Sequence, residues 1–324
     1  MERRRKGDHA VAQALDRKTL LQKDRALKRR LIVQNLDLYL LVAVPLLSLI
    51  LFHYLPMFGI TLAFKEYKVL KGFWGSDWVG LAHFQRLFTN QKFFQLLRNT
   101  ILMNVYKFVF QFPLPILLAL MLNEVRQVFL KRGVQTLVYL PHFLSWVVVA
   151  GIFYDILGVN GLVNTFAKSM GWPAVQMLAN ERTFRSLIVL TTAWKESGWS
   201  TIIYLSAITA IDPQLYEAAS VDGAGRFRQV FSITLPSIVH TIAFIVILRA
   251  SSIMGADTEQ IMMFYKPIVY GVGDVIGTFV YREGLLQSKY SYTTAVGLFS
   301  SIVGMAMMLG SNRIARKYTG KGIW

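Results

Sequence analysis

EAASVDGAGRFRQVFSITLP, residues 217–236, is a polar stretch between two apolar segments that are each long enough to cross a bilayer. Asp212 and Pro213 precede it as the N-cap and first residue of a short helix, because Asp caps free N–H groups and Pro needs none there. Gly223 and Gly225 can end that helix and turn the chain. The stretch therefore predicts two short helices joined by a turn on a membrane surface, with a small-residue face that a partner protein can approach.

The apolar runs around this stretch define the class of protein. Of the 324 residues, 54% are hydrophobic and only 16% are charged, and there is no cysteine, which excludes disulfides and cysteine-ligated metals. A helix needs about 20 apolar residues to cross the hydrocarbon layer. Six runs reach that length, at 36–64, 98–122, 134–157, 186–211, 236–263 and 291–311. We therefore expect an all-α membrane protein with six transmembrane helices in a membrane domain, 36–324, that follows a basic segment, 1–35.

The net charge of +17 raises the possibility of nucleic-acid binding, but the basic residues are placed as in membrane proteins. Eleven of them lie in the first thirty positions, and others cluster at 126–132, 226–228 and 313–321. Six spans put all four clusters on one side, as the positive-inside rule expects, so both termini should be cytoplasmic. Anionic membrane lipid, rather than nucleic acid, accounts for the charge. The N-terminal segment either lies on the inner leaflet as an amphipathic helix or is a solvated topology anchor.

The central stretch also resembles a loop of a known family. It contains EAA, then G after three residues and ITLP after nine more, with Asp222 before the glycine. This pattern resembles the EAA loop of permease subunits of binding-protein-dependent ABC importers, which forms a coupling helix that docks on the ATP-binding subunit. An amphipathic cytoplasmic loop without a partner is the alternative. The resemblance implies a coupling loop at 212–235, with coupling roles for Glu217, Ala218, Ala219, Asp222, Gly223, Ala224 and Arg226.

Three further segments resemble the sugar branch of this family: GLAHFQRLF at 80–88, the aromatic loop 264–290, and the C-terminal GKGIW. The last two resemble the branch that imports polysaccharides or oligosaccharides, alginate among them. The resemblance implies a maltose-type permease fold in the bacterial inner membrane, assembled with a second, paralogous permease subunit, two ATP-binding subunits and an extracytoplasmic binding protein. We expect the loop 264–290 to be exposed on the outer side, where the binding protein docks.

The sequence lacks the motifs of an ATPase or a metalloenzyme. TGKG at 319–322 lacks the first glycine of a phosphate loop and has no helix after it. No nucleophile elbow is evident, and His142 has no second ligand at i+3 or i+4, so we expect it to pack or to line a path. We therefore predict no catalytic residue, no metal site and no cofactor in this chain, with ATP and Mg²⁺ bound by the partner ATPase.

Polar residues recur on one face of the second apolar run. Thr100, Asn104, Lys107 and Gln111 follow at intervals of four, three and four, which places them on one face of a helix. Hydrocarbon penalises polar groups, so this face should contact protein or water. It either lines a translocation path, with Asn104, Lys107 and Gln111 as candidates, or bonds to neighbouring helices.

The fourth run contains a charged pair, Lys195 and Glu196, between Trp194 and Trp199. Adjacent helical residues point about 100° apart, so we expect no direct pairing and a partner for each charge on another helix or in a wet cavity. Aromatic rings beside polar groups suit a sugar, so all four are path candidates; an ion-pair network between helices is the alternative. Arg249, in the fifth run, is expected either to meet Glu196 or to line the path.

Two other classes of function use the same residues. An ion-coupled secondary transporter or channel would use Lys195, Glu196 and Arg249 as coupling charges, but it leaves the EAA spacing unexplained. A membrane scaffold would use them only to join helices. We therefore favour the transmembrane subunit of an ATP-driven importer of an oligosaccharide or polysaccharide.

Overall fold

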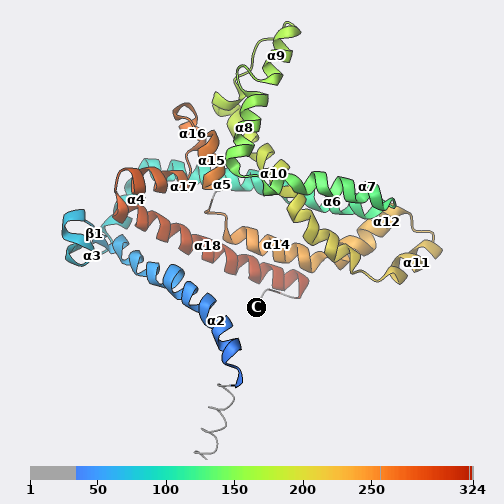
Figure 1. Ribbon diagram of the computed structural model, residues 1–324, viewed down its shortest axis with the longest axis horizontal. Helices are drawn as coiled ribbons and strands as arrows, with labels where there is room; N and C mark the ends of the chain where they lie inside the picture. Colours follow the sequence, from blue (N-terminus) through green and yellow to red (C-terminus); the bar gives the residue numbers. More distant parts are fainter. Residues whose placement is uncertain (1–33, 256, 321, 323–324) are drawn as a thin grey trace, which may run out of the picture. The chain divides into compact units, whose positions relative to one another are not determined.

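Helices make up nearly all of the regular structure in this computed structural model, which describes residues 34–255, 257–320 and 322 (Figure 1). The helical fold class expected from the apolar runs is confirmed for that part of the chain. The basic segment predicted at 1–35 lies outside the described residues except for its last two positions. The chain divides into two units, Met1–Thr61 and Leu62–Trp324.

One long apolar helical stretch accounts for nearly all of the described part of the first unit and ends three residues into the second. α2 (Leu36–Leu49) continues through a π-helical turn, η1 (Ile50–Tyr54), into a 3-10 helix, η2 (Leu55–Phe64). The whole stretch is long and apolar enough to cross a membrane. The side chains of α2 are exposed, which suits a helix in contact with lipid.

The second unit is built from helices with short connections, after a β-hairpin in which β1 (Lys65–Glu66) pairs antiparallel with β2 (Asp77–Trp78). In chain order, the helical elements are η3 (Val69–Lys71), α3 (Gly72–Gly75), α4 (Ala82–Thr89), α5 (Gln91–Gln111), α6 (Pro113–Glu124), α7 (Val128–Tyr139), η4 (Leu140–Phe143), α8 (Trp146–Leu157), α9 (Leu162–Ser169), η5 (Met177–Ala179), α10 (Glu181–Thr209), α11 (Pro213–Val221), α12 (Arg226–Gln229), η6 (Val230–Thr234), α13 (Leu235–Ser237), α14 (Val239–Ser251), α15 (Thr258–Phe264), η7 (Pro267–Val269), α16 (Tyr270–Gly273), α17 (Ile276–Phe279), η8 (Val280–Leu286) and α18 (Tyr290–Thr319).

α10 organises the core of this unit and buries side chains along its whole length. It packs against α5, α6, α7 and η4, and Figure 1 shows it among these helices. Phe184 and Ile188, near its start, belong to one apolar cluster, and Tyr204 and Ile208, near its end, belong to another. At Gly198 the helix comes so close to α7 that an added Cβ would collide with the carbonyl oxygen of Val138.

The third apolar run, expected as one helix over 134–157, is broken in the structure. α7 ends at Tyr139, the chain passes through η4, and α8 begins after Ser145, whose hydroxyl accepts a hydrogen bond from a backbone amide of α8 at 3.3 Å. Pro141 accounts for the break, because proline lacks the N–H that would continue the hydrogen bonds of α7 and its ring crowds the preceding turn. The expectation of a single helix here was wrong.

Four helical stretches in the described part of the chain are long and apolar enough to cross a membrane: Leu36–Phe64, Gln91–Glu124, Trp146–Ser169 and Tyr290–Tyr318. A fifth is formed if Arg226–Ser237 and Val239–Ser251, which meet at 59°, make one broken span. α10 is as long as the others, but its charged residues lower its apolar character. The count of six spans and the cytoplasmic termini therefore stay predictions.

Candidate coupling loop and translocation path

The coupling loop, residues 212–235, has the local structure that its sequence predicts. The Asp212 side chain accepts a hydrogen bond from the Gln214 amide at 3.0 Å, and Pro213 occupies the first position of α11. Gly223 has a φ of +75°, in the left-handed region that glycine enters without steric cost. α12 follows after this turn. The two short helices joined by a glycine turn are therefore confirmed.

Most side chains of the coupling loop are exposed. Of the residues predicted to couple, Ala219 and Ala224 are half-buried, whereas Glu217, Ala218, Asp222, Gly223 and Arg226 are exposed. Large apolar side chains are exposed too, namely Leu215 (50%), Val221 (89%), Phe227 (84%) and Phe231 (67%). Exposed apolar groups that gather on one polar element are typical of a protein interaction site.

One of three side-chain contacts joins the coupling loop to α6, and the other two hold the loop together. Arg226 Nη1 donates to Glu124 Oε2 on α6 at 2.9 Å. The Tyr216 hydroxyl lies 2.9 Å from Thr234 Oγ1 on η6, and Gln229 donates to a backbone carbonyl of the glycine turn. Sequence reasoning did not identify Glu124, because it lies 102 positions from Arg226 and no local pattern marks it.

The coupling loop continues directly into a broken helix. α12, η6 and α13 form one helical stretch, Arg226–Ser237, which meets α14 at 59°. The buried side chain of Ile238 lies at this bend and belongs to an apolar cluster with α6 and α10. The coupling loop is therefore joined to α14 through this bend.

A cavity of about 220 Å³ is lined mainly by α5, α10, α14 and the chain just after α14. Asn104, Lys107 and Gln111 line it from α5, and Arg249 lines it from α14. Four of the predicted path residues are thus brought to one cavity, although Arg249 lies 138 positions or more from the other three in the sequence.

The polar face of α5 also bonds to its neighbours. Lys107 Nζ donates to Asp257 Oδ2 at 2.8 Å and to Gln260 Oε1 at 2.7 Å. The Asn104 amide donates to the backbone carbonyl after α14 at 2.8 Å, and Gln111 donates to a carbonyl of α10 at 3.4 Å. The interpretation that the stripe bonds to neighbouring helices is therefore confirmed, and the same side chains also line the cavity.

Lys195 and Glu196 form a compact cluster with η4. Lys195 Nζ donates to the His142 carbonyl at 2.8 Å, and Glu196 Oε2 lies 2.8 Å from His142 Nδ1. Trp199 stacks on the His142 ring with centroids 4.6 Å apart, and Lys195 Nζ lies 5.2 Å from the Trp146 ring centroid. Each charge has a partner on another element, as expected. The two also bond each other at 3.0 Å, so the expectation that they do not pair was wrong; their long side chains converge on the same turn.

The remaining path candidates lie apart from this cluster. Trp194 contacts Phe153 of α8 edge-on, with centroids 5.7 Å apart. Arg249 does not bond Glu196, whose oxygens are taken by Lys195 and His142. Over the described stretches of the chain, no group of three or more His, Asp or Glu side chains is placed to hold a metal ion.

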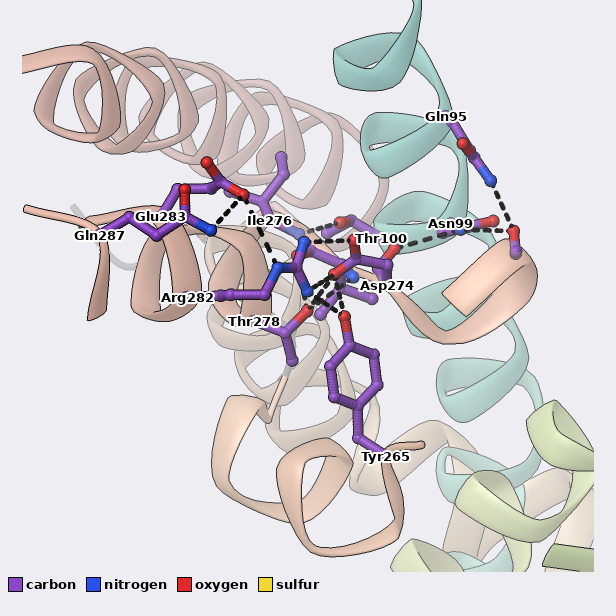
Figure 2. A network of polar contacts seen from close by, with 12 residues as sticks. Gln95, Asn99, Thr100, Tyr265, Asp274, Ile276, Thr278, Arg282, Glu283 and Gln287 are labelled. Carbon is purple, nitrogen blue, oxygen red and sulfur yellow. Dashed lines mark hydrogen bonds and ion pairs between the residues drawn. The ribbon is translucent and has the colours of Figure 1, made fainter. Parts of the chain in front are cut away.

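A second polar cluster lies in the outer segment, residues 264–289, and is shown in Figure 2. The Asp274 carboxylate accepts hydrogen bonds from Thr278 Oγ1 and Arg282 Nη2, both at 2.8 Å, and from the Tyr265 hydroxyl. Burial and the hydrogen bond to Asp274 raise the pKa of Tyr265, so its hydroxyl keeps the proton that it donates. Arg282 also donates to Tyr265. Asp274, Thr278 and Arg282 recur at i, i+4 and i+8, a helical spacing that was a missed signal for this cluster.

The outer segment is anchored to the first half of α5, as Figure 2 shows. Asn99 Nδ2 donates to the Gly271 and Asp274 carbonyls at 3.0 and 3.1 Å, and Thr100 Oγ1 accepts from the Ile276 amide at 3.0 Å. Much of the segment is buried, including Asp274, Ile276 and the ring of Phe279. The expectation that this loop is exposed holds only for part of it, since residues 285–289 are exposed whereas 273–276 are buried.

The chain is similar to known transport proteins over most of its length. A family model described as "Binding-protein-dependent transport system inner membrane component" matches residues 111–320. The polygalacturonan/rhamnogalacturonan transport system permease protein YteP of Bacillus subtilis (strain 168) is 44% identical, covering 97% of this chain and 99% of that protein. Protein LplB of the same organism is 43% identical, covering 89% and 91%.

A solved structure matches the fold over nearly the same length. It is the crystal structure of a bacterial alginate ABC transporter in complex with an alginate pentasaccharide-bound periplasmic protein. One of its chains superposes with a TM-score of 0.82 and 38% sequence identity, covering 90% of this chain and 98% of that chain.

Proposed function

Because this chain belongs to the family of binding-protein-dependent transport system inner membrane components, we propose that it carries an acidic oligosaccharide across the membrane for an ATP-driven importer. It is a permease subunit of a sugar ABC importer and is not an enzyme; a separate ATPase subunit hydrolyses ATP. It is an inner membrane protein with several membrane-crossing helices. Six spans and cytoplasmic termini are the topology that we propose.

The proposed substrate rests on the relatives. One transports polygalacturonan or rhamnogalacturonan, and the solved neighbour imports the acidic polysaccharide alginate. Both substrates contain sugars with carboxylates. We therefore propose an oligosaccharide that contains uronic acid, of which alginate is one candidate, delivered by an extracytoplasmic binding protein.

The observation that carries the proposal is the coupling loop. It presents Glu217, Ala218 and exposed apolar side chains on two short helices that lead directly into α14. We propose that it docks on one of two partner ATPases, which bind ATP and Mg²⁺. Closure of the ATPase dimer would then move the loop and α14 as one body against a second, paralogous permease subunit. Ala219, Asp222, Gly223, Ala224 and Arg226 shape the docking surface.

We propose the cavity lined by Asn104, Lys107, Gln111 and Arg249 as this subunit's part of the translocation path. The contacts of Lys195, Glu196 and Trp199 with His142 support the network interpretation for that cluster, which holds η4 against α10. Trp194 packs on α8 beside it. An ion-coupled transporter would use the same charges, but it gives the exposed coupling loop no role.

The test is ATPase activity of the assembled transporter in nanodiscs. This chain is co-expressed with its second permease, ATPases and binding protein, and acidic oligosaccharides are compared with neutral maltodextrins. We expect stimulation by the acidic class that Glu217→Ala abolishes. Glu259→Ala, which removes another exposed carboxylate from a short helix, is the matched control and should keep the stimulation. No co-purifying ATPase, or no stimulation by any saccharide, would contradict the proposal.

A further inference from the structure

Arg249 is an unpaired cation in a membrane-crossing segment. It lies in the last turn of α14 and lines the cavity described above. Within the described residues, its guanidinium has neither an ion-pair partner nor a hydrogen-bond partner. The carbonyls at the end of α14 offset part of its charge, but its N–H donors stay unbonded. A cation at such a place is costly to keep in a membrane and calls for an anion or water.

The other charges that line the cavity neutralise each other. Lys107 is almost fully buried and donates to Asp257 and Gln260, so its charge is already compensated. Asp257 is in turn held by Lys107. Glu196 acts on Lys107 from farther away, and its oxygens are taken by Lys195 and His142. The charge left over in the cavity is therefore positive and belongs to Arg249.

The rest of the cavity lining suits a sugar. Asn104, Gln111, Ser200 and Tyr204 bring amide and hydroxyl groups to it. The rings of Phe108 and Phe112 also line it and stack on each other with centroids 5.2 Å apart. Polar groups can bond sugar hydroxyls, whereas apolar rings contact the C–H face of a pyranose. The lining therefore combines both kinds of surface with one free cation.

We propose that Arg249 binds the carboxylate of a uronic acid residue during passage, and that it makes the path selective for acidic over neutral oligosaccharides. This inference rests on the proposed function. A guanidinium matches a carboxylate in two parallel hydrogen bonds, which an ammonium ion cannot reproduce. Arg249 would act after the binding protein has released the sugar. It would therefore select acidic over neutral oligosaccharides in addition to the selection made by the binding protein.

The experiment uses the complete transporter in proteoliposomes. Trigalacturonate is the acidic probe, and its fully methyl-esterified form is the neutral one. The quantity measured is the number of sugar molecules imported per ATP hydrolysed, which corrects for how well each sugar recruits the binding protein. The variants are Arg249→Gln, Arg249→Lys and, as a matched control, Arg182→Gln, which removes an exposed arginine that does not line this cavity.

We expect Arg249→Gln to lower trigalacturonate import per ATP by about tenfold or more, as for loss of a charge-assisted hydrogen bond. Its assembly with the other subunits should persist, and its import of any ester that the wild type accepts should not fall. Arg249→Lys should recover part of the loss. Arg182→Gln should behave as the wild type.

Three other outcomes would overturn parts of this account. Trigalacturonate import by Arg249→Gln at the wild-type yield would remove the proposed role of Arg249 while leaving the importer intact. Failure of Arg249→Gln to co-purify with the second permease would show that the guanidinium is paired across the subunit interface instead. Absence of ATP-dependent import of any saccharide by the wild type would contradict the proposed function itself.

Discussion

The coupling loop and the outer segment satisfy their side chains in opposite ways. The coupling loop exposes Val221 and Phe227, and Glu217 has no charged partner among the residues that the structure describes. The outer segment buries Phe279 and surrounds Asp274 with three donors. A segment whose polar and apolar groups are satisfied internally is complete without a partner, whereas one with exposed apolar groups is not. The difference supports the proposal that a partner docks on the coupling loop.

The largest effect on stability is expected at the centre of the outer segment. Asp274→Ala leaves Arg282 and the Tyr265 hydroxyl without their shared acceptor, and breaking a buried ion pair costs about 3–5 kcal/mol. The measurement is the free energy of unfolding in mixed micelles. The double variant with Arg282→Ala should lose less than the sum of the single variants. If Asp274→Ala lowered the free energy of unfolding no more than a surface substitution does, the outer segment would not be more strongly held by its internal contacts than the coupling loop.

The helix that leads into the coupling loop should tolerate less change than the loop. Gly198→Ala would force a methyl group into the Val138 carbonyl, and overpacking of this kind costs about 1–3 kcal/mol. Gly151→Ala, on α8, meets no atom within 4 Å and is the matched control. Equal unfolding free energies for the two variants would mean that α7 and α10 do not approach as closely as described.

A smaller loss is expected inside the coupling loop. Gly223→Ala would place a Cβ in the left-handed region, at a cost of about 1–2 kcal/mol. Gly225→Ala, at a φ of −68°, should be nearly neutral. We expect stimulated ATPase activity to fall for Gly223→Ala only. If both variants behaved alike in unfolding and in ATPase assays, the turn would not depend on glycine geometry.

The smallest effect on stability is expected from Phe227→Ala. Its side chain is 84% exposed, so the unfolding free energy should change by no more than about 0.5 kcal/mol. Binding of the ATPase should weaken by about 2 kcal/mol if this ring is a docking anchor. Phe279→Ala, in the outer segment, should show the reverse, with a loss of about 3 kcal/mol in stability and normal ATPase binding. Unchanged ATPase affinity for Phe227→Ala would remove this ring from the docking surface.

The same contrast explains what the sequence could predict. The caps and turn of the coupling loop depend on Asp212, Pro213 and Gly223, which act on their immediate neighbours, so local patterns identify them. The bonds of the outer segment join Asn99 to Gly271 and Thr100 to Ile276, pairs more than 170 positions apart. No single-sequence pattern assigns such partners.

The path residues show the same limit at a finer scale. Periodicity correctly placed Asn104, Lys107 and Gln111 on one face of α5, but it could not supply Asp257 as the partner of Lys107. Apolar length alone also misjudged the third run, because it took no account of Pro141. A hydropathy average treats every side chain of a helix as if it faced the same surroundings. In α10, Lys195 and Glu196 are instead paired inside the protein.

The bend at Ile238 has a mechanical consequence. Arg249 lies eleven residues beyond it, which is about 16 Å along a helix at roughly 1.5 Å per residue. If α14 pivots there, a rotation of about 10° swings the guanidinium end of this arm through about 3 Å, comparable to the length of a hydrogen bond. A rotation of this size at Ile238 would thus be enough to release a carboxylate from Arg249. The binding of the sugar and the movement driven by the ATPase would then both depend on the position of α14.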